Sequence, residues 1–208
     1  RATKVIGPLR EKYSDVRFYE TDVSNEKKVR ESVERVAKQL GIPKILVNNA
    51  AIEYNDSGNL VTMPLDRLRK ILETNLVGYL HLARAVIPYM ERSGEGRIVN
   101  ISSVQAIQSC RPGTIYQITK GAADDLTRVL TLEYARKGIR VNTVSPGGIK
   151  TDGMGNARTE DNPRALDDLI RSTPLGRRGH PQEVANAVLF LLSSQASYIY
   201  VANLPVDG

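Results

Sequence analysis

Tyr116 and Lys120, in the run Tyr-Gln-Ile-Thr-Lys, are the residue types needed to move a proton to or from an alcohol or a carbonyl. Positions i and i+4 of a helix share a face, so the phenol and the ammonium can point into one cleft. A cation beside a phenol favours the phenolate and lowers its pKa toward neutral pH. Ser103 ends an apolar segment thirteen positions upstream, where its hydroxyl can hydrogen-bond a reacting oxygen. Taken alone, the Tyr–Lys pair also fits an ordinary solvated helix face.

Length and composition fit a single domain over residues 1–208, with 41% hydrophobic and 25% charged residues. The net charge of +6 is spread among acidic residues without a basic block, which argues against a nucleic-acid partner. The longest apolar run, residues 187–192, is too short to cross a bilayer. One cysteine, Cys110, excludes an internal disulfide and fits a reducing compartment. We therefore expect a cytoplasmic protein with no membrane partner and no metal site.

Apolar periodicity predicts alternating strands and helices, which is typical of an α/β fold with a parallel sheet. The first predicted helix follows Ser24 as its N-cap and ends at Gly41, and residues 44–48 form a strand buried on both faces. The predicted strands are residues 16–20, 44–48, 97–102, 139–145 and 203–206. The other predicted helices are residues 64–90, 114–137 and 181–193.

Short motifs follow one another in a fixed order along this pattern. They are Asn48-Asn-Ala-Ala51, Asn75-Leu-Val-Gly78, Ser103 with Tyr116 and Lys120, Pro146-Gly-Gly-Ile-Lys-Thr151, and Pro174-Leu-Gly-Arg-Arg-Gly-His-Pro-Gln-Glu-Val184. In order and separation they resemble the short-chain dehydrogenase/reductase family over essentially the whole chain. The resemblance implies a Rossmann-like, doubly wound parallel sheet in three αβα layers. It also implies an enzyme that transfers hydride between NAD or NADP and an alcohol or carbonyl.

One part of the family pattern is missing. The family opens with a strand, a Gly-rich turn and a helix whose N-terminus holds the cofactor pyrophosphate, yet no G-x-G-x-x-G occurs here. The first two strands of the fold are therefore absent from this sequence. Residues 16–20 would lack a neighbouring strand, so we expect an N-terminally incomplete domain.

The resemblance assigns catalytic roles to four residues. Tyr116 is the acid/base, Lys120 lowers its pKa and holds the nicotinamide ribose, and Ser103 orients the substrate oxygen. Ser102 is the adjacent candidate, but the family spacing to Tyr116 favours Ser103. Asn75 would distort its helix and hold a water that extends the proton relay.

Other positions would bind the cofactor, in addition to Tyr116 and Lys120. Asp22 resembles the acid that bonds the adenine amino group, although an acid near a helix N-terminus is also common. Ala51 stands where the family usually has Gly, and Tyr200-Val201 where it commonly has Thr-Gly. The full cofactor set is Asp22, Val23, Asn48, Ala50, Ala51, Pro146, Gly147, Ile149 and Thr151.

Substrate choice is expected to lie in residues 105–115 and in a polar lid at 152–172. Within the family, the segments around Glu53 and Gln105 look most like aldose 1-dehydrogenases, so both side chains could bond sugar hydroxyls. For Glu53, a loop carboxylate facing water is the plain alternative. A 3-oxoacyl carrier-protein reductase is the runner-up function. A third hypothesis, suggested by the missing phosphate loop, is a non-catalytic scaffold. Family members commonly form homotetramers or homodimers through the long helices and the C-terminal segment.

Overall fold

The computed structural model describes residues 2–13, 15–53, 59–109, 113–151 and 163–208. Its described residues form one four-stranded parallel sheet in the order β1-β2-β3-β4. The strands are β1 (Ile45–Asn48), β2 (Gly96–Ile101), β3 (Ile139–Pro146) and β4 (Asn203–Val206). All four lie within two residues of the bounds predicted from the apolar runs.

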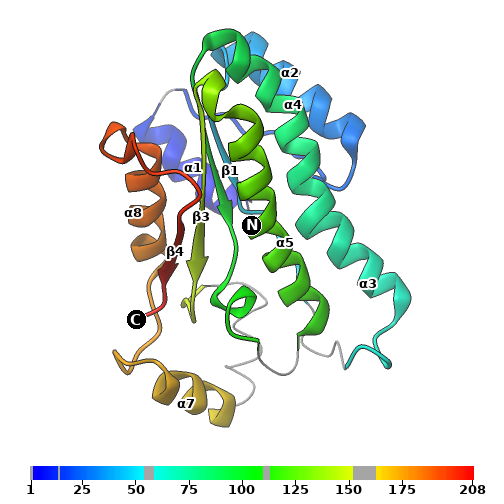
Figure 1. The fold of residues 1–208 in the computed structure, drawn as a ribbon, viewed down its shortest axis with the longest axis vertical. Coiled ribbons are helices and arrows are strands. Elements are labelled where there is room, and N and C mark those ends of the chain that lie inside the picture. The colour runs from blue at the N-terminus through cyan, green and yellow to red at the C-terminus, as the bar shows by residue number, and fades with distance from the viewer. Residues whose placement is uncertain (1, 14, 54–58, 110–112, 152–162) are drawn as a thin grey trace.

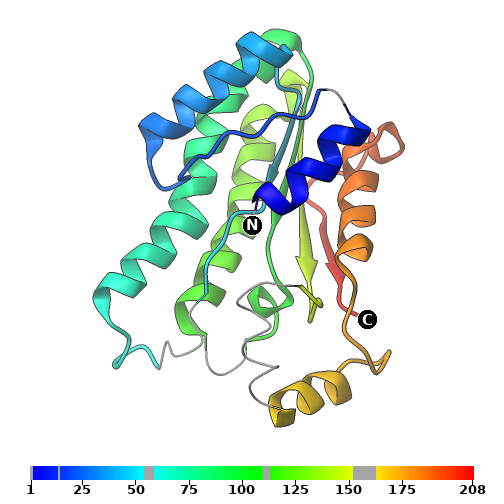
Figure 2. The same cartoon turned by 180° about the vertical axis from the view of Figure 1, so that it is seen from behind.

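Helices cover the sheet on both faces, which gives the three-layer α/β fold that the sequence predicts (Figures 1 and 2). Neighbouring residues of β2 face opposite layers: Ile98 packs with the core under α4 and α5, and Val99 with the core under α8. The helices are α1 (Ala2–Lys12), α2 (Glu26–Leu40), α3 (Leu65–Leu72), α4 (Gly78–Ser93), α5 (Thr114–Tyr134), α7 (Pro163–Ser172) and α8 (Pro181–Leu192). Three short 3-10 turns span Val104–Ala106, Ala135–Lys137 and Ser194–Ala196. Within the described residues, no helix is long and apolar enough to cross a membrane.

The long helix predicted over 64–90 is interrupted by a π-helical turn, Glu73–Val77, between α3 and α4. Asn75 is fully buried inside this turn. Such π turns widen the helix by one residue and occur often at functional sites. The helix distortion expected at Asn75 is therefore confirmed.

Three local predictions are wrong. Residues 16–20 form no strand, because no described strand lies beside them to accept their backbone hydrogen bonds. The N-cap of α2 is Asn25 rather than Ser24, since the Asn25 side chain accepts from Lys28 N at 3.0 Å. Strand β1 is buried on one face only, with Ile45 50% and Val47 39% exposed, because these alternate side chains point to the face of the strand that the described residues leave uncovered.

Two helices were not predicted. Helix α1 contains Pro8, a residue that normally disfavours a helix interior. Helix α7 lies in the segment predicted as a polar lid, although Leu166, Leu169 and Ile170 have helical spacing there. The remainder of that predicted lid, residues 152–162, lies outside the described residues.

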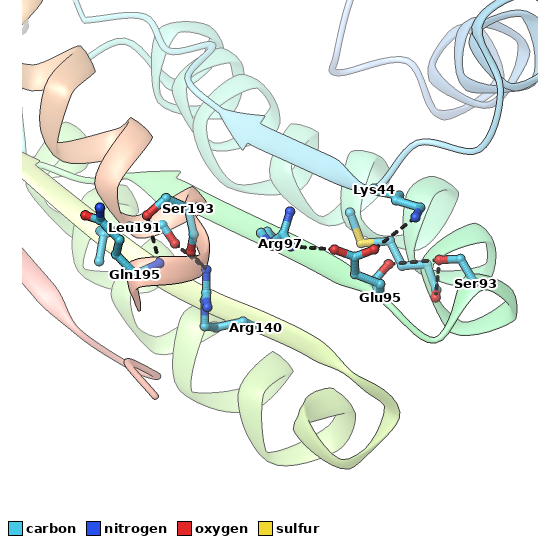
Figure 3. A network of polar contacts seen from close by, with 9 residues as sticks. Lys44, Ser93, Glu95, Arg97, Arg140, Leu191, Ser193 and Gln195 are labelled. Atoms are coloured by element: carbon cyan, nitrogen blue, oxygen red, sulfur yellow. Dashed lines mark hydrogen bonds and ion pairs between the residues drawn. The ribbon is translucent and has the colours of Figure 1, made fainter. Parts of the chain in front are cut away.

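Polar contacts tie the strands together at their amino ends, away from the ends where the motifs lie (Figure 3). Glu95 accepts from Lys44 at 2.9 Å and also pairs with Arg97, which links the starts of β1 and β2. The buried Arg140 of β3 donates to Leu191 O at 2.7 Å and to Ser193 O at 2.9 Å. A cation at these carbonyls caps the C-terminal end of α8 and fixes that helix on the sheet.

Val201 is the one non-glycine residue with positive φ in the described chain, at 59°. A β-branched side chain in this left-handed region is strained by about 1–2 kcal/mol. We therefore expect Val201→Gly to raise the free energy of unfolding by about 0.5–1 kcal/mol in chemical denaturation. The increase is smaller than the strain that is relieved, because glycine also increases the conformational entropy of the unfolded chain. Val201→Ala serves as the control, because alanine keeps a Cβ and should recover less. Equal stability of the glycine variant and the parent would contradict the assignment of strain.

Candidate active site

A cavity of about 840 Å³ opens at the carboxyl ends of β1, β2 and β3. The apolar strands end there, so the polar residues that follow them meet at one edge of the sheet, as in other open α/β folds. Its lining includes the predicted catalytic and substrate residues Glu53, Ser103, Gln105, Tyr116 and Lys120. Residues 53, 103–105, 116 and 120, far apart in the sequence, are thus brought together.

Tyr116 and Lys120 lie on the first turns of α5 and face this cavity together. The Lys120 Nζ atom lies 5.5 Å from the centre of the Tyr116 ring. Tyr116 is partly exposed, whereas Lys120 is only 2% exposed. The phenol can therefore meet a substrate while the ammonium remains beneath it.

Burial lowers the pKa of Lys120 to about 8, because the charged form loses its hydration. The negative charges of Asp124 and Glu53 oppose this change. Burial also raises the pKa of Asp124, which lies one helical turn beyond Lys120 and accepts from Asn203 at 2.9 Å. A lysine whose pKa is close to neutral pH is common where a side chain takes part in proton transfer.

The two adjacent serines have different partners. Ser103 Oγ accepts from Gln105 N at 3.2 Å, so its own hydrogen can be donated to a substrate oxygen. Ser102 Oγ instead donates to the Lys120 carbonyl at 2.9 Å, which ties β2 to α5. This difference favours Ser103 over Ser102 as the residue that orients the substrate.

Asn75 does not line the cavity but holds one of its walls. Its amide accepts from Ile52 N at 2.8 Å and donates to Ile52 O at 2.9 Å. The same Nδ2 lies 3.3 Å from the Thr119 hydroxyl on α5. Asn75 therefore fixes the segment that carries Glu53 relative to the helix that carries Tyr116.

The predicted cofactor residues fall into two groups. Ala51, Pro146, Gly147, Ile149 and Thr151 line the cavity.

The other four predicted cofactor residues, Asp22, Val23, Asn48 and Ala50, do not line this cavity. Asn48 is fully buried and donates to Asn100 Oδ1 at 2.8 Å, and Ala50 lies between it and Ala51. Val23 packs beneath Gly78, and Asp22 lines a separate surface pocket of about 410 Å³. The Ser24 hydroxyl and amide donate to Asp22 and lower its pKa.

Sequence reasoning missed several residues of the site. Tyr79 is fully buried against Lys120, and its place one turn after Asn75 was the available signal. Leu169 of α7 with Val184 and Val188 of α8 form an apolar wall of the cavity, and Arg178 lies at its edge. The helical spacing of Leu166, Leu169 and Ile170 within the predicted lid was the available signal for the part of the wall that α7 supplies.

Comparison with known proteins agrees with this geometry. A family model described as enoyl-(acyl carrier protein) reductase matches residues 1–208. The 2-(R)-hydroxypropyl-CoM dehydrogenase of Xanthobacter autotrophicus is 37% identical over 188 residues, 90% of this chain and 74% of that protein. The 3-oxoacyl-[acyl-carrier-protein] reductase of Thermotoga maritima is 35% identical over 191 residues, 91% and 75% of the two chains. The chain belongs to the short-chain dehydrogenase/reductase family, a family of oxidoreductases.

Solved structures of dehydrogenases share the fold over most of this chain. An NAD+-bound xylitol dehydrogenase has a TM-score of 0.93 at 30% identity, covering 99% of this chain and 84% of that one. A gluconate 5-dehydrogenase from Burkholderia cenocepacia, in complex with NADP and tartrate, has a TM-score of 0.84 at 34% identity. It covers 90% of this chain and 72% of that one.

Proposed function

We propose that this short-chain dehydrogenase interconverts an alcohol and a carbonyl with NAD or NADP, and that Tyr116 is the acid/base. The supporting observation is that Ser103, Tyr116 and Lys120 line one cavity at the carboxyl edge of the sheet. That cavity also contains Ala51, Pro146, Gly147, Ile149 and Thr151, which would hold the nicotinamide nucleotide together with Lys120. Bound NAD(P) would supply the hydride acceptor or donor.

The side chains of this chain then have distinct roles. Ser103 donates a hydrogen bond to the substrate oxygen and Tyr116 exchanges its proton with that oxygen. The Lys120 ammonium stabilises negative charge on Tyr116. Asn75 keeps the Glu53 segment and α5 in register through its bonds to Ile52 and Thr119.

We further propose a small polyhydroxylated substrate, such as an aldose oxidised at C1. Among the described residues, the Gln105 Oε1 atom is buried and accepts no hydrogen bond, which is a costly arrangement unless a ligand donates to it. Gln105 Oε1 and Glu53 Oε1 both lie 3.6 Å from the position that a Cβ on Gly113 would occupy. Two acceptors that converge beside Tyr116 suit the hydroxyl groups of a sugar or polyol.

The test compares two reactions of the same enzyme. Oxidation of glucose, mannose and xylitol with NAD+ or NADP+ is measured against reduction of an acetoacetyl thioester with NADH or NADPH. Efficient sugar or polyol oxidation supports the proposal. The apolar wall of Leu169, Val184 and Val188 is the observation that favours the second candidate, a 3-oxoacyl thioester reductase. Preferential thioester reduction would replace the first candidate with the second.

Glu53→Gln is expected to lower kcat/KM for the sugar by about fivefold to tenfold, since the amide oxygen still accepts a hydrogen bond but lacks the negative charge of the carboxylate. The ratio of sugar oxidation to oxidation of a simple secondary alcohol isolates this effect, because any change through Lys120 alters both rates. Glu73→Gln, at an exposed position outside the cavity, is the matched control. An unchanged ratio in the Glu53 variant would show that the carboxylate makes no contact with the substrate.

We also propose a cytoplasmic homodimer or homotetramer. Exposed apolar side chains lie on α5 and along the C-terminal segment, where family members associate. Leu132 of α5 is 87% exposed and Tyr198 is 98% exposed. Burial of such side chains between two copies would be favourable by about 25 cal/mol for each Å² of apolar surface removed from water. Size-exclusion chromatography with light scattering measures the assembly directly, and a monomer at micromolar concentration would reject it.

A further inference from the structure

Lys120 lies between two tyrosines rather than beside one. Its Nζ atom is 5.5 Å from the ring centre of Tyr116 and 5.6 Å from that of Tyr79. Tyr116 lines the cavity, whereas Tyr79, on the first turn of α4, is fully buried. The catalytic lysine thus has a second phenol on its closed side.

A closed set of hydrogen bonds joins Tyr79 to Lys120. The Tyr79 hydroxyl donates to Ile101 O at 3.1 Å. Lys120 Nζ donates to the same carbonyl at 2.7 Å and to the Tyr79 oxygen at 3.5 Å. Because Ile101 takes the phenolic hydrogen, the lone pairs of Tyr79 are left to face the ammonium.

We propose that Tyr79 is a positioning residue that holds the ammonium group of Lys120 in its charged form at a fixed place beneath Tyr116. No motif of the chain assigns this residue a role. Its effect on turnover rests on the dehydrogenase function proposed above, whereas its effect on Lys120 does not.

Tyr79 acts through Lys120 and not as a second acid/base. Burial and the neighbouring Tyr116 raise the pKa of Tyr79 well above its usual value, so it remains a neutral phenol. It does not line the cavity and cannot meet a substrate there. Tyr79 therefore contributes an oxygen lone pair, which favours the ammonium over the neutral amine.

Other titratable side chains also lie near Lys120. Tyr116 and Asp124 lie on its own helix, and Glu53 lies on the segment after β1. Both carboxylates favour the charged lysine. Tyr79→Phe leaves all three groups in place, and Ile101 O still accepts from Lys120. The Tyr79→Phe variant thus tests the contact between the Tyr79 hydroxyl and the Lys120 ammonium.

The first test is independent of turnover. The pKa of Lys120 is followed through its side-chain ¹³Cε resonance in an NMR titration, and the resonance is assigned with Lys120→Met. In Tyr79→Phe this pKa is expected to fall by about half a unit to one unit, the effect of one weak hydrogen bond to the cation. Tyr89→Phe, the same change on the same helix outside the cavity, should leave it unaltered. An equal Lys120 pKa in Tyr79→Phe and the parent overturns the proposal.

The second test measures the pH dependence of catalysis. Without the Tyr79 hydroxyl the ammonium is no longer held beneath Tyr116 and stabilises the phenolate less, so Tyr116 should ionise at higher pH. The acid limb of kcat/KM for alcohol oxidation should then move up by about half a unit to one unit. At pH 7 this is about a threefold to tenfold loss. A purely structural role for Tyr79 would lower thermal stability and leave the pH profile unmoved, which would also overturn the proposal. If the parent enzyme oxidises no alcohol, the proposed function fails, and the NMR titration still decides the role of Tyr79.

Discussion

Tyr116→Phe is expected to lower kcat/KM for alcohol oxidation by about 10³-fold or more, within the range lost with a general acid/base. The variant keeps the ring but has no group that can accept the substrate proton. Because Tyr116 is partly exposed at the cavity wall, removal of its hydroxyl should change the free energy of unfolding little. The measurement is steady-state absorbance at 340 nm, with thermal melting of the same samples.

The control for this prediction is Tyr134→Phe. Tyr134 ends the same helix and lies outside the cavity, so its hydroxyl should be dispensable. Nucleotide affinity, measured by NADH fluorescence, should remain within about threefold in Tyr116→Phe, since its loss concerns chemistry and not binding. Comparable rates in Tyr116→Phe and Tyr134→Phe would remove Tyr116 from the mechanism.

Lys120→Met is expected to make the protein more stable and nearly inactive. Burial lowers the pKa of Lys120 from 10.5 to about 8, so the charged side chain destabilises the native state. At pH 7 this cost is on the order of 3 kcal/mol. We expect the methionine variant to recover about 1–3 kcal/mol in chemical denaturation. Tyr79 still donates to Ile101 O, so no buried carbonyl is left without a donor.

The pH dependence of this gain has a definite sign. Below pH 8 the lysine is protonated in both states, and the cost is fully present. As pH rises from about 8 to 10.5, the native state releases its proton first. The unfolded state then binds more protons, so the free energy of unfolding of the parent increases. The advantage of Lys120→Met should therefore shrink between pH 7 and pH 10.

The matched control is Lys38→Met, at an exposed position in the last turn of α2, which should show no comparable gain. Activity of Lys120→Met should fall by about two to four orders of magnitude, because the phenolate loses its cation. A variant that is less stable than the parent at pH 7, or a gain that grows with pH, would contradict the burial of a charged lysine.

The sequence predicted the elements that depend on local pattern. The apolar runs around Val47, Ile98 and Val141 predicted β1, β2 and β3, because a parallel sheet between helices needs continuous apolar strands. Elements that depend on a neighbour were predicted less well. Residues 16–20 alternate like a strand but pair with no described strand, and the uncovered face of β1 leaves Ile45 and Val47 exposed. A pattern within one segment does not report what lies beside it.

The site shows the same division. Ser103, Tyr116 and Lys120 were predicted from type and spacing and line one cavity. The choice of Ser103 over Ser102 rested on spacing, and the partners of the two hydroxyls now give it a physical reason. Tyr79 lies outside the motifs found in the sequence, and it reaches Lys120 only because α4 packs on the end of β2. Asp22 and Asn48 were expected at the cofactor and lie away from the cavity lining.

In the mechanism that we propose, an alcohol bound in this cavity gives its hydride to NAD(P)+ and its proton to Tyr116. The most direct measurement is the primary isotope effect on NAD(P)+ reduction by a polyol deuterated at the carbon that is oxidised, followed at 340 nm. We expect alcohol-dependent reduction that is slower with the deuterated substrate and is abolished in Tyr116→Phe. Binding of the nucleotide without reduction by any alcohol or polyol, or reduction that continues unchanged in Tyr116→Phe, would contradict this mechanism.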